Sequence, residues 1–442
     1  MNQYQNTTIH GQFDPLVAST ALARAGLFDR HVVYERDEEW CYAGGALGEI
    51  TLDSAELRVR WGGEETVEPV GNRPLTQVAA ALGRLPINDW NSYGWVAFEL
   101  SYLAHRRIDV PPGTPLLHLI LPRTEVRIRA DRVVIRATER SSSDLIRSVL
   151  DTPQREPGGT PSPAPIDSYG AEMYQKSVAV AVDDIRRGEL QKVILSRPVP
   201  ITGPVDIPAT YLNGRRKNTP ARSFLLDLGG WRAMGFSPET VVEVDAGGAV
   251  STQPLAGTRA HGLGDEQDAR LRGELVEDAK EIYEHAISVK LGYEELRTVC
   301  DPGSVVVSDF MTVKPRGSVQ HLGSRVVGQL APEKSAWDAL EALFPAITAS
   351  GVPKEAAYER IARLEPGPRG LYSGAVLTAS SDGSMDAALV LRALYEQDGR
   401  AWLRAGAGIV ADSQPARELE ETREKLSSVA PHVIGADPVD GP

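Results

Sequence analysis

Residues 387–428 read AALVLRALYEQDGRAWLRAGAGIVADSQPARELEETREKLSS. The apolar residues over 387–395 and 401–407 predict two consecutive strands, and residues 414–428 have the periodicity of a helix. We expect Ser413 to cap the start of that helix. Two strands followed by one helix depart from the strand–helix–strand alternation of a parallel sheet. The segment therefore favours antiparallel pairing.

Elements of the same two kinds fill the preceding residues back to 171. A helix is predicted over 172–188, with Gly188 at its C-terminal end, and a long helix is predicted over 267–299. The predicted strands are 192–197, 223–228, 240–244, 249–253 and 305–313. Long strands without regular alternation with helices predict an α+β fold with large antiparallel sheets.

Residues 1–152 are rich in short strand patterns. Polar and apolar residues alternate over 56–61, and residues 125–139 predict a hairpin. Residues 153–170, PQREPGGTPSPAPIDSYG, have the composition of a surface connection or a mobile linker. We place there the boundary between an N-terminal half and a catalytic half, residues 171–436. Composition does not decide whether the halves are separate domains or one structural unit.

The composition of the chain indicates which kinds of molecule it can bind and where it is located. Lys and Arg number 47 against 60 Asp and Glu, which gives the 442-residue chain a net charge of −13. This charge repels nucleic acid, whereas basic residues inside a cleft can still attract a small anionic substrate. Residues 1–11 lack a signal-peptide core, and no apolar run approaches the roughly 20 residues that span a bilayer. With Cys41 and Cys300 as the two cysteines, we expect no disulfide and a cytoplasmic location.

Two pairs of glutamates could form a metal site. Glu281 and Glu284 are three residues apart in one predicted helix, and Glu418 and Glu421 are three apart in another. On a helix this spacing places both carboxylates on one face, with about 5–6 Å between Cβ atoms. Two facing pairs would offer the oxygen ligands that suit Mg²⁺. Solvated helix faces of acidic proteins also carry glutamates at this spacing, so spacing alone leaves both interpretations open.

Four further residues each allow two interpretations. Lys192 begins a predicted strand and is either an exposed edge lysine or, in a closed cleft, a base. Glu239 lies between two predicted strands and could act as an acid if burial raised its pKa. His285 and His321 are single histidines, which are more often structural than functional. No cysteine–histidine cluster in the sequence indicates a transition metal.

The residues Gly406, Ala407 and Gly408, with Ala411 after them, match the GxGxxG/A pattern of dinucleotide-binding loops. Such a site also requires a later strand with an acidic residue about 20 positions on. The residues after the predicted helix over 414–428 leave little room for this additional strand. We therefore expect the glycines to let backbone amides approach a carboxylate.

A series of short motifs over residues 172–433 resembles one family. The motifs are LQKVILSR (190–197), GFSPE (235–239), PLAGTRA (254–260), KEIYEHAISV (280–289), RGLYSGAV (369–376), RAGAGIVADS (404–413) and ELEETREKL (418–426). Together they resemble the chorismate-utilising enzymes, which include the anthranilate, aminodeoxychorismate, isochorismate and salicylate synthases. The resemblance implies one large unit in which antiparallel sheets pack together with helices outside, and it implies dependence on Mg²⁺.

The resemblance also implies a role for each candidate residue. Lys192 would be the general base that activates water for attack at C2 of chorismate, and Glu239 would be the general acid that protonates the departing C4 hydroxyl. Arg392 and Tyr372 would bind the carboxylate of the enolpyruvyl arm. The ligands of Mg²⁺ would be Glu281, Glu284, Glu418 and Glu421. The other pocket residues would be Gly257, Thr258, Thr348, Gly406 and Lys425, with His321 beside the enolpyruvyl ether.

The motifs also separate members of the family. Aminating members usually carry Gln at the position of Lys192, and because water needs a base whereas ammonia does not, Lys192 favours hydroxylation. SVQHLGS (318–324) and FPAITASGVPK (344–354) most resemble the salicylate synthases of siderophore pathways, which make salicylate from chorismate through isochorismate. The alternatives are an isochorismate synthase that stops at isochorismate and a chorismate-binding paralogue without activity. The use of water implies no obligate glutamine amidotransferase partner, and we expect a monomer.

Overall fold

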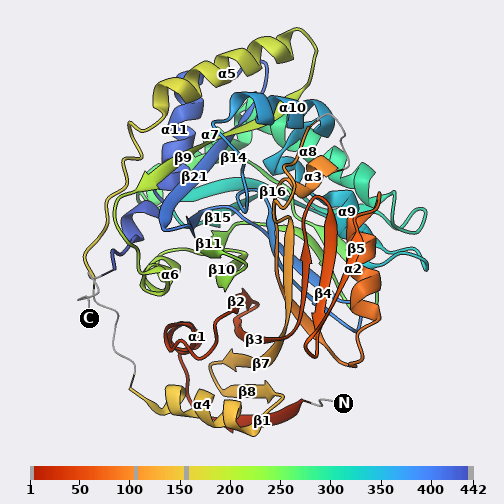
Figure 1. The fold of residues 1–442 in the computed structure, drawn as a ribbon. Helices are drawn as coiled ribbons and strands as arrows, with labels where there is room; N and C mark the ends of the chain where they lie inside the picture. Colours follow the sequence, from red (N-terminus) through yellow and green to blue (C-terminus); the bar gives the residue numbers. More distant parts are fainter. Residues whose placement is uncertain (1–3, 104–107, 154–158, 437–442) are drawn as a thin grey trace.

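The strands of this protein form one connected antiparallel network. The computed structural model describes residues 4–103, 108–153 and 159–436 (Figure 1). Within these ranges 21 strands pair, and each pairing is antiparallel. The strands are β1 (Gln5–His10), β2 (His31–Arg36), β3 (Glu39–Leu52), β4 (Glu56–Trp61), β5 (Glu64–Pro69), β6 (Asn91–Val96), β7 (Leu117–Arg129), β8 (Arg132–Ala137), β9 (Lys192–Ile201), β10 (Arg222–Leu228), β11 (Trp231–Ser237), β12 (Thr240–Val244), β13 (Ala249–Thr252), β14 (Leu255–Ala260), β15 (Val306–Arg316), β16 (Val319–Gln329), β17 (Gly351–Val352), β18 (Ala375–Ser380), β19 (Met385–Leu389), β20 (Ala393–Gln397) and β21 (Arg400–Ile409). The predicted α+β class is therefore confirmed.

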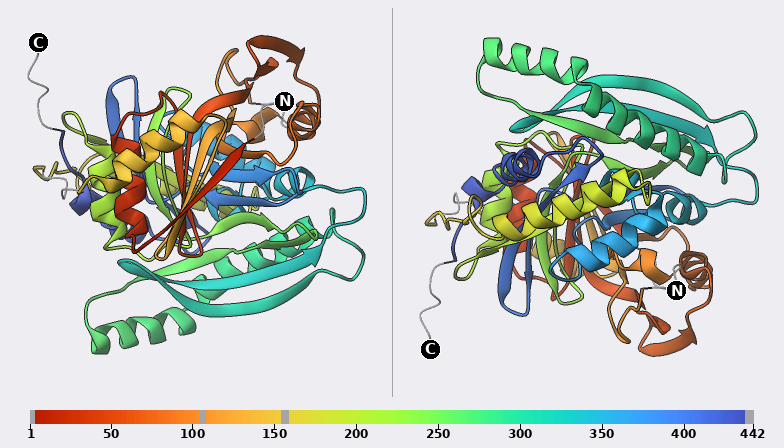
Figure 2. Two further views of the ribbon diagram at one scale, coloured as in Figure 1. Left: turned by 90° about the horizontal axis from the view of Figure 1, so that it is seen from below. Right: turned by 90° about the horizontal axis from the view of Figure 1, so that it is seen from above.

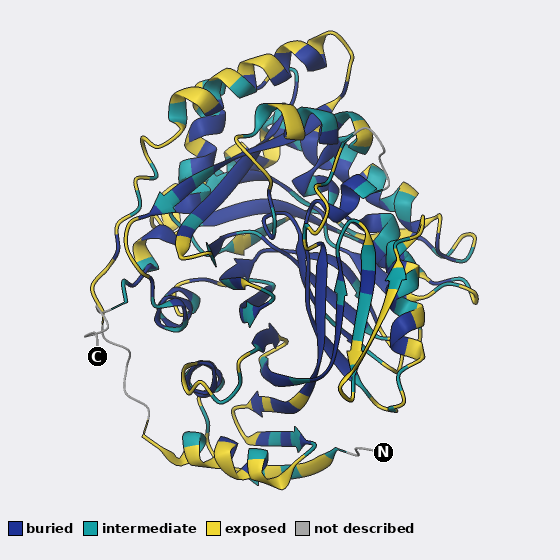
Figure 3. Cartoon of the chain, viewed as in Figure 1, coloured by how far each residue is buried: buried dark blue, intermediate teal, exposed yellow. Residues whose placement is uncertain are grey.

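Most helices lie on the outside of the strands. Figure 1 shows α5, α10 and α11 along one outer side, and Figure 2 shows α7 and α8 against β14–β16. The strands are largely buried, whereas α4 and α5 present exposed outer faces (Figure 3). The helices are α1 (Pro15–Arg24), α2 (Pro74–Gly83), α3 (Leu100–Leu103), α4 (Arg140–Asp151), α5 (Ala171–Arg186), α6 (Ile207–Arg215), α7 (Asp265–Glu277), α8 (Ala279–Leu296), α9 (Ala336–Leu343), α10 (Lys354–Leu364) and α11 (Pro415–Leu426), with 3₁₀ turns η1 (Ile347–Ala349) and η2 (Ala430–His432). Over the described ranges, no helix has the combined length and apolarity needed to cross a membrane.

Strands from the two halves of the sequence pair directly with each other. Tyr34 of β2 is opposite Phe224 of β10, and Trp95 of β6 is opposite Val376 of β18. All four side chains are buried in the same apolar cluster. The halves are therefore joined by main-chain hydrogen bonds and by a shared core.

The described part of the predicted connection runs along the surface. Pro161 forms a bridge with Ile434, and the buried guanidinium of Arg197 donates to the carbonyls of Ile166 and Tyr169 at 2.6 and 2.8 Å. Residues 159–170 are thus attached to the catalytic half. Residues 154–158 of the predicted connection lie outside the described ranges.

Several predicted elements agree closely with the structure. β4 and β12 have the predicted bounds, and the hairpin of β7 and β8 turns at Ala130 and Asp131. Helix α5 ends just before Gly188, whose φ of 78° lies in the left-handed region that glycine tolerates.

Three predictions of local structure are wrong. The long helix over 267–299 is two helices, because the carboxylate of Asp278 accepts hydrogen bonds from the first amides of α8 and caps it. The strand over 387–395 is divided into β19 and β20, and Arg392 between them has a φ of 50°. The cap of α11 is Gln414 and not Ser413, whose hydroxyl accepts from the Val410 amide instead.

Candidate active site

One cavity brings together most of the residues predicted for the site. It encloses about 770 Å³, including its open mouth, and its wall is formed largely by β14, β21 and α11. The predicted residues on this wall are Glu239, Gly257, Thr258, Glu284, His321, Thr348, Tyr372, Arg392, Gly406, Glu421 and Lys425. The predicted residues that are buried without forming part of the wall are Lys192, Glu281 and Glu418.

Glu239 has the properties of an acid that keeps its proton near neutral pH. It follows β11 at the turn into β12 and is 2% exposed. One carboxyl oxygen accepts from the hydroxyl of Thr348, and the other accepts from the amide of Leu255 at 2.7 Å. Burial raises the pKa of Glu239 to about 7, against the opposing effect of these two hydrogen bonds. The protonated form is therefore available for donation at neutral pH.

Lys192, the first residue of β9, is fully buried and contacts α8. Its Nζ lies 3.0 Å from Oε1 of Glu284 and donates to the hydroxyl of Ser288 at 3.0 Å. Because Glu284 is on the cavity wall, Lys192 adjoins the cavity through this carboxylate. His285, the next residue of α8, instead contacts the hydroxyl of Ser324 at 2.6 Å and is not on the wall.

Arg392 and His321 form a buried pair on the wall of the cavity. Nη2 of Arg392 donates to Nε2 of His321, and Nη1 donates to the carbonyl of Arg316 at 2.9 Å. Nδ1 of His321 lies 3.1 Å from the carbonyl of Gly257 and from the hydroxyl of Thr258. Burial, together with the charge of Arg392, holds the pKa of His321 well below its usual range, so the ring is neutral. Arg392 is thus a fixed cation beside a neutral histidine.

Lys425 provides a second cation on the wall. Its Nζ donates to the carbonyl of Gly406 at 2.9 Å and to Oε1 of Glu421 at 2.7 Å. Burial opposes the charged form of Lys425, but Glu421 overcomes this effect and raises the pKa. A Cβ at Gly406 would lie 2.5 Å from the carbonyl oxygen of Leu195 and 2.9 Å from the hydroxyl of Tyr372. Glycine at this position therefore allows β21 to approach β9 and leaves space for the tyrosine.

Each predicted metal ligand is paired with a basic side chain. The pairs are Glu281 with Arg259 (3.1 Å), Glu284 with Lys192 (3.0 Å), Glu418 with Lys280 (2.9 Å) and Glu421 with Lys425 (2.7 Å). In the part of the chain that the structure describes, no group of three or more His, Cys, Asp or Glu side chains is assembled to hold a metal ion. The structure thus presents four neutralised carboxylates.

The donor set nevertheless fits a divalent cation chemically. Oε2 of Glu281 and Oε2 of Glu418 are buried and have no hydrogen-bond partner among the described residues. Burial and the nearby charge of Glu421 raise the pKa of both groups, that of Glu418 to about 7. A cation relieves this repulsion, and unpaired carboxylate oxygens are the ligands that Mg²⁺ prefers. Metal binding would require these carboxylates to exchange basic partners for the ion.

The cavity wall also contains residues that were not predicted for the site. Gly408 faces Glu284, since a Cβ at this position would lie 2.1 Å from Oε1 of that carboxylate. Arg404 is on the wall with its guanidinium group buried. Alternate residues of a strand face the same side, so Arg404 and Gly408 could have been inferred from the placement of Gly406. The apolar part of the wall includes Leu255, Leu391 and Leu403, for which the sequence carries no distinctive signal.

Comparison with known proteins assigns the chain to a family. The profile of the chorismate-binding enzymes matches residues 30–431. The chain therefore belongs to this family, and the resemblance found in its motifs is confirmed.

Individual relatives agree with this assignment. The chain is 47% identical over 412 residues to a salicylate synthase of Mycolicibacterium paratuberculosis, covering 93% of this chain and 91% of the relative. Among solved structures, anthranilate synthase component I of Streptococcus pneumoniae TIGR4 superimposes with a TM-score of 0.73 at 28% identity, over 89% of this chain and 92% of that one. The menaquinone-specific isochorismate synthase of Escherichia coli superimposes with a TM-score of 0.75 over 97% of this chain and 94% of that one. At 22% identity, this second structure supports the fold alone.

Proposed function

We propose that this protein is a salicylate synthase, which converts chorismate through isochorismate to salicylate and pyruvate. The observation that carries the proposal is the presence, in one site, of a buried lysine and a carboxyl group that keeps its proton near neutral pH. The charge of Lys192 is among those that lower the pKa of Glu239, so the two groups act within range of each other. The 47% identity to a salicylate synthase, over nearly the whole of both chains, supports the same activity.

The first step exchanges one hydroxyl group for another. Lys192 takes a proton from water as the water oxygen bonds to C2 of the chorismate ring. Glu239 gives its proton to the C4 hydroxyl, which leaves as water while the ring double bonds shift. Water is a poor nucleophile and hydroxide a poor leaving group, so this step needs both a base and an acid.

The second step releases pyruvate. The hydrogen at C2 of isochorismate moves to the methylene carbon of the enolpyruvyl arm as the bond between the ring and the ether oxygen breaks, which leaves an aromatic ring. Arg392 and Tyr372 would hold the carboxylate of that arm in the required conformation. Both nitrogens of His321 already have protein partners, so this neutral ring orients Arg392 and does not transfer the proton.

Glu281, Glu284, Glu418 and Glu421 would hold Mg²⁺, which supplies positive charge for the ring carboxylate of a dianionic substrate. In this arrangement Arg392 would bind one carboxylate and the acidic helices α8 and α11 would place the other. Because the nucleophile is water, the reaction requires no glutamine amidotransferase partner. We also propose that the protein is a monomer, that it is located in the cytoplasm and that it acts in siderophore biosynthesis.

Product analysis by chromatography tests this function directly. Purified protein is incubated with chorismate and Mg²⁺, with and without an ammonium salt. We expect salicylate and an equimolar amount of pyruvate in both cases. Isochorismate alone would indicate an isochorismate synthase, and anthranilate formed with ammonium would contradict the role of Lys192. Unchanged chorismate would contradict any catalytic function.

A further inference from the structure

Two guanidinium groups, bound to the same carboxylate, lie close to the aromatic ring of Tyr372. Cζ of Arg369 is 5.5 Å from the centre of the ring, and Cζ of Arg404 is 5.4 Å from it. Both distances are within the range of about 6 Å over which a cation and an aromatic ring attract each other. Tyr372 is on the cavity wall, and among the described residues its hydroxyl has no protein partner. This hydroxyl is thus a free donor at the cavity.

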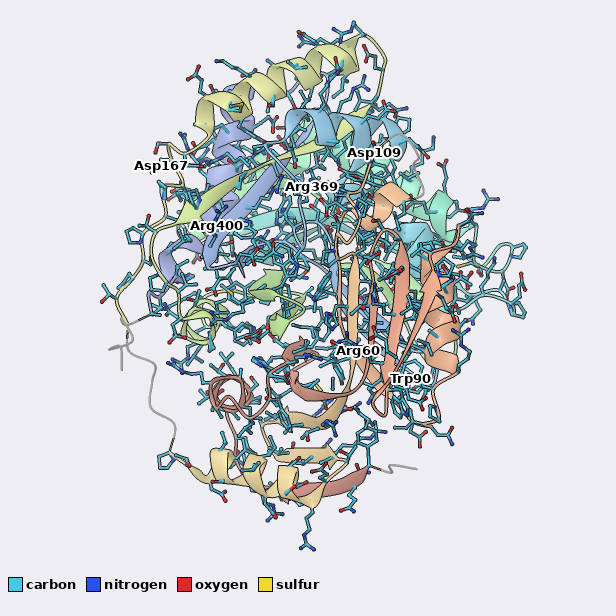
Figure 4. The ribbon with its side chains drawn as sticks, viewed as in Figure 1. Arg60, Trp90, Asp109, Asp167, Arg369 and Arg400 are labelled. Carbon is cyan, nitrogen blue, oxygen red and sulfur yellow. The ribbon has the colours of Figure 1, made fainter. Side chains whose placement is uncertain are left out.

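One carboxylate, that of Glu365, binds both guanidinium groups. Its Oε2 accepts from Nη2 of Arg404 at 2.5 Å and from Nε of Arg369 at 3.0 Å, while its Oε1 accepts from Nη2 of Arg369 at 2.6 Å. All three side chains are buried, and Figure 4 shows Arg369 in the interior of the molecule. A buried ion network contributes little more to stability than apolar residues of the same volume. Its stabilising effect alone therefore does not account for its position beneath Tyr372.

The network holds both guanidinium groups in fixed positions near the ring. Two guanidinium groups share the single carboxylate of Glu365, and the other buried carboxylate nearby is that of Glu99, which accepts from the amides of Arg369 and Gly370. Each cation attracts the aromatic ring, so the two arginines restrict the position of Tyr372.

Arg404 does not offer a free face of its own to a ligand. Its Nε donates to the hydroxyl of Ser196 at 2.8 Å, its Nη1 donates to the carbonyl of Pro368 at 2.7 Å, and its Nη2 binds Glu365. Each nitrogen of the guanidinium group is therefore engaged by the protein. Arg404 thus lines the cavity beside Tyr372 with its guanidinium nitrogens bound to the protein.

We propose that Arg404, held by Glu365 beside Arg369, is a positioning residue that fixes the ring of Tyr372 so that its hydroxyl can donate to a carboxylate of the substrate. The inference rests on the proposed function, because it assumes that Tyr372 binds the enolpyruvyl carboxylate of chorismate. It adds a residue that acts through Tyr372 and not by contact with the substrate.

A double-mutant cycle with Arg404→Gln and Tyr372→Phe tests this role. Tyr372→Phe keeps the ring but removes the hydroxyl. Since the hydroxyl binds the substrate carboxylate before and during the reaction, we expect Arg404→Gln to raise KM for chorismate about tenfold with kcat nearly unchanged. In the Tyr372→Phe background the same substitution should raise KM by less than about twofold. Arg404→Lys, which keeps the charge, should restore most of the affinity.

Two controls separate this role from general damage to the fold. Ser196→Ala removes the hydrogen bonds of this hydroxyl to Arg404 and to Glu365 but keeps the ion pair between them, and should leave KM close to that of the unmodified protein. Thermal unfolding of each variant identifies loss of folding. If the effects of Arg404→Gln and Tyr372→Phe on KM multiply independently, or if Arg404→Lys is as impaired as Arg404→Gln, the inference is wrong. Absence of chorismate turnover in the unmodified protein would instead refute the proposed function.

Discussion

Replacement of Glu239 by Gln tests whether the Glu239 carboxyl group keeps its proton in the folded protein and donates that proton in the reaction. Burial raises the pKa of Glu239 from 4.5 to about 7. At 1.36 kcal/mol for each tenfold change in proton affinity, this difference corresponds to ~3 kcal/mol in favour of the protonated form in the folded protein. A glutamine side chain is nearly isosteric with the protonated acid, but it can neither ionise nor donate a proton to a leaving hydroxyl.

The sign of the pH dependence follows from the direction of the shift. Because the folded-state pKa is above the unfolded value, the stabilisation from Glu239 is fully present below pH 4.5 and is lost as the pH rises to about 7. Above that pH the folded protein carries a buried carboxylate, which the glutamine variant lacks. The free energy of unfolding of the variant should therefore increase, relative to the unmodified protein, by ~2–3 kcal/mol between about pH 5 and about pH 8.

Urea unfolding and chorismate consumption, both measured at these two pH values, provide the assay. Turnover of Glu239→Gln should fall by about 10²- to 10⁴-fold at either pH, the usual contribution of a general acid. The same substitution at the exposed Glu333 is the control and should leave both measurements unchanged. An equal difference in unfolding free energy at the two pH values would refute the inference that Glu239 keeps its proton on folding. Retained turnover would refute its role as the acid.

Three further substitutions or treatments have defined outcomes. Lys192→Gln should abolish water-dependent turnover in a folded protein whose melting temperature is lowered, because Glu284 loses its buried partner. Full activity in that variant would contradict the assignment of the base. A chelator should abolish turnover, and added Mg²⁺ should restore it. Mg²⁺ should also raise the melting temperature, because the unpaired oxygens of Glu281 and Glu418 gain a partner. Undiminished turnover in excess chelator would exclude the metal site. Gly408→Ala should reduce turnover at least tenfold, since its Cβ would lie 2.1 Å from Oε1 of Glu284 and must displace that carboxylate. Unchanged kinetics would mean that the Glu284 carboxylate can move aside without loss of activity.

The parts of the site that follow local rules could be predicted from the sequence. Glu281 and Glu284 lie on one face of α8 as their spacing requires, and both are buried. The strand that begins at Lys192 and the acid at the turn after β11 also lie where the pattern of strands placed them. For the two glutamates, the periodicity of the helix fixed the common direction of their side chains.

The remaining features depend on contacts between distant segments. Arg392 interrupts a run that is apolar enough for one strand, because its carbonyl accepts from Phe236 of β11 and its guanidinium binds the carbonyl of Arg316. Likewise, no spacing rule predicts that Glu284 is paired with Lys192 or that Glu418 is paired with Lys280. In each pair the two side chains belong to different helices or strands, so tertiary packing determines which of them meet.

The pairing of β9 with β21 has a consequence for the order in which the molecule forms. Arg404 and Ser196, which lie on these two strands and are hydrogen-bonded, are separated by 208 positions in the sequence. Contacts between such distant positions form slowly, and a chain on the ribosome folds from its N-terminus. During synthesis, Lys192 and Glu239 therefore emerge long before the strand that completes the cavity. Chorismate turnover can begin only after β21 and α11 have left the ribosome, so a nascent chain handles no reactive intermediate.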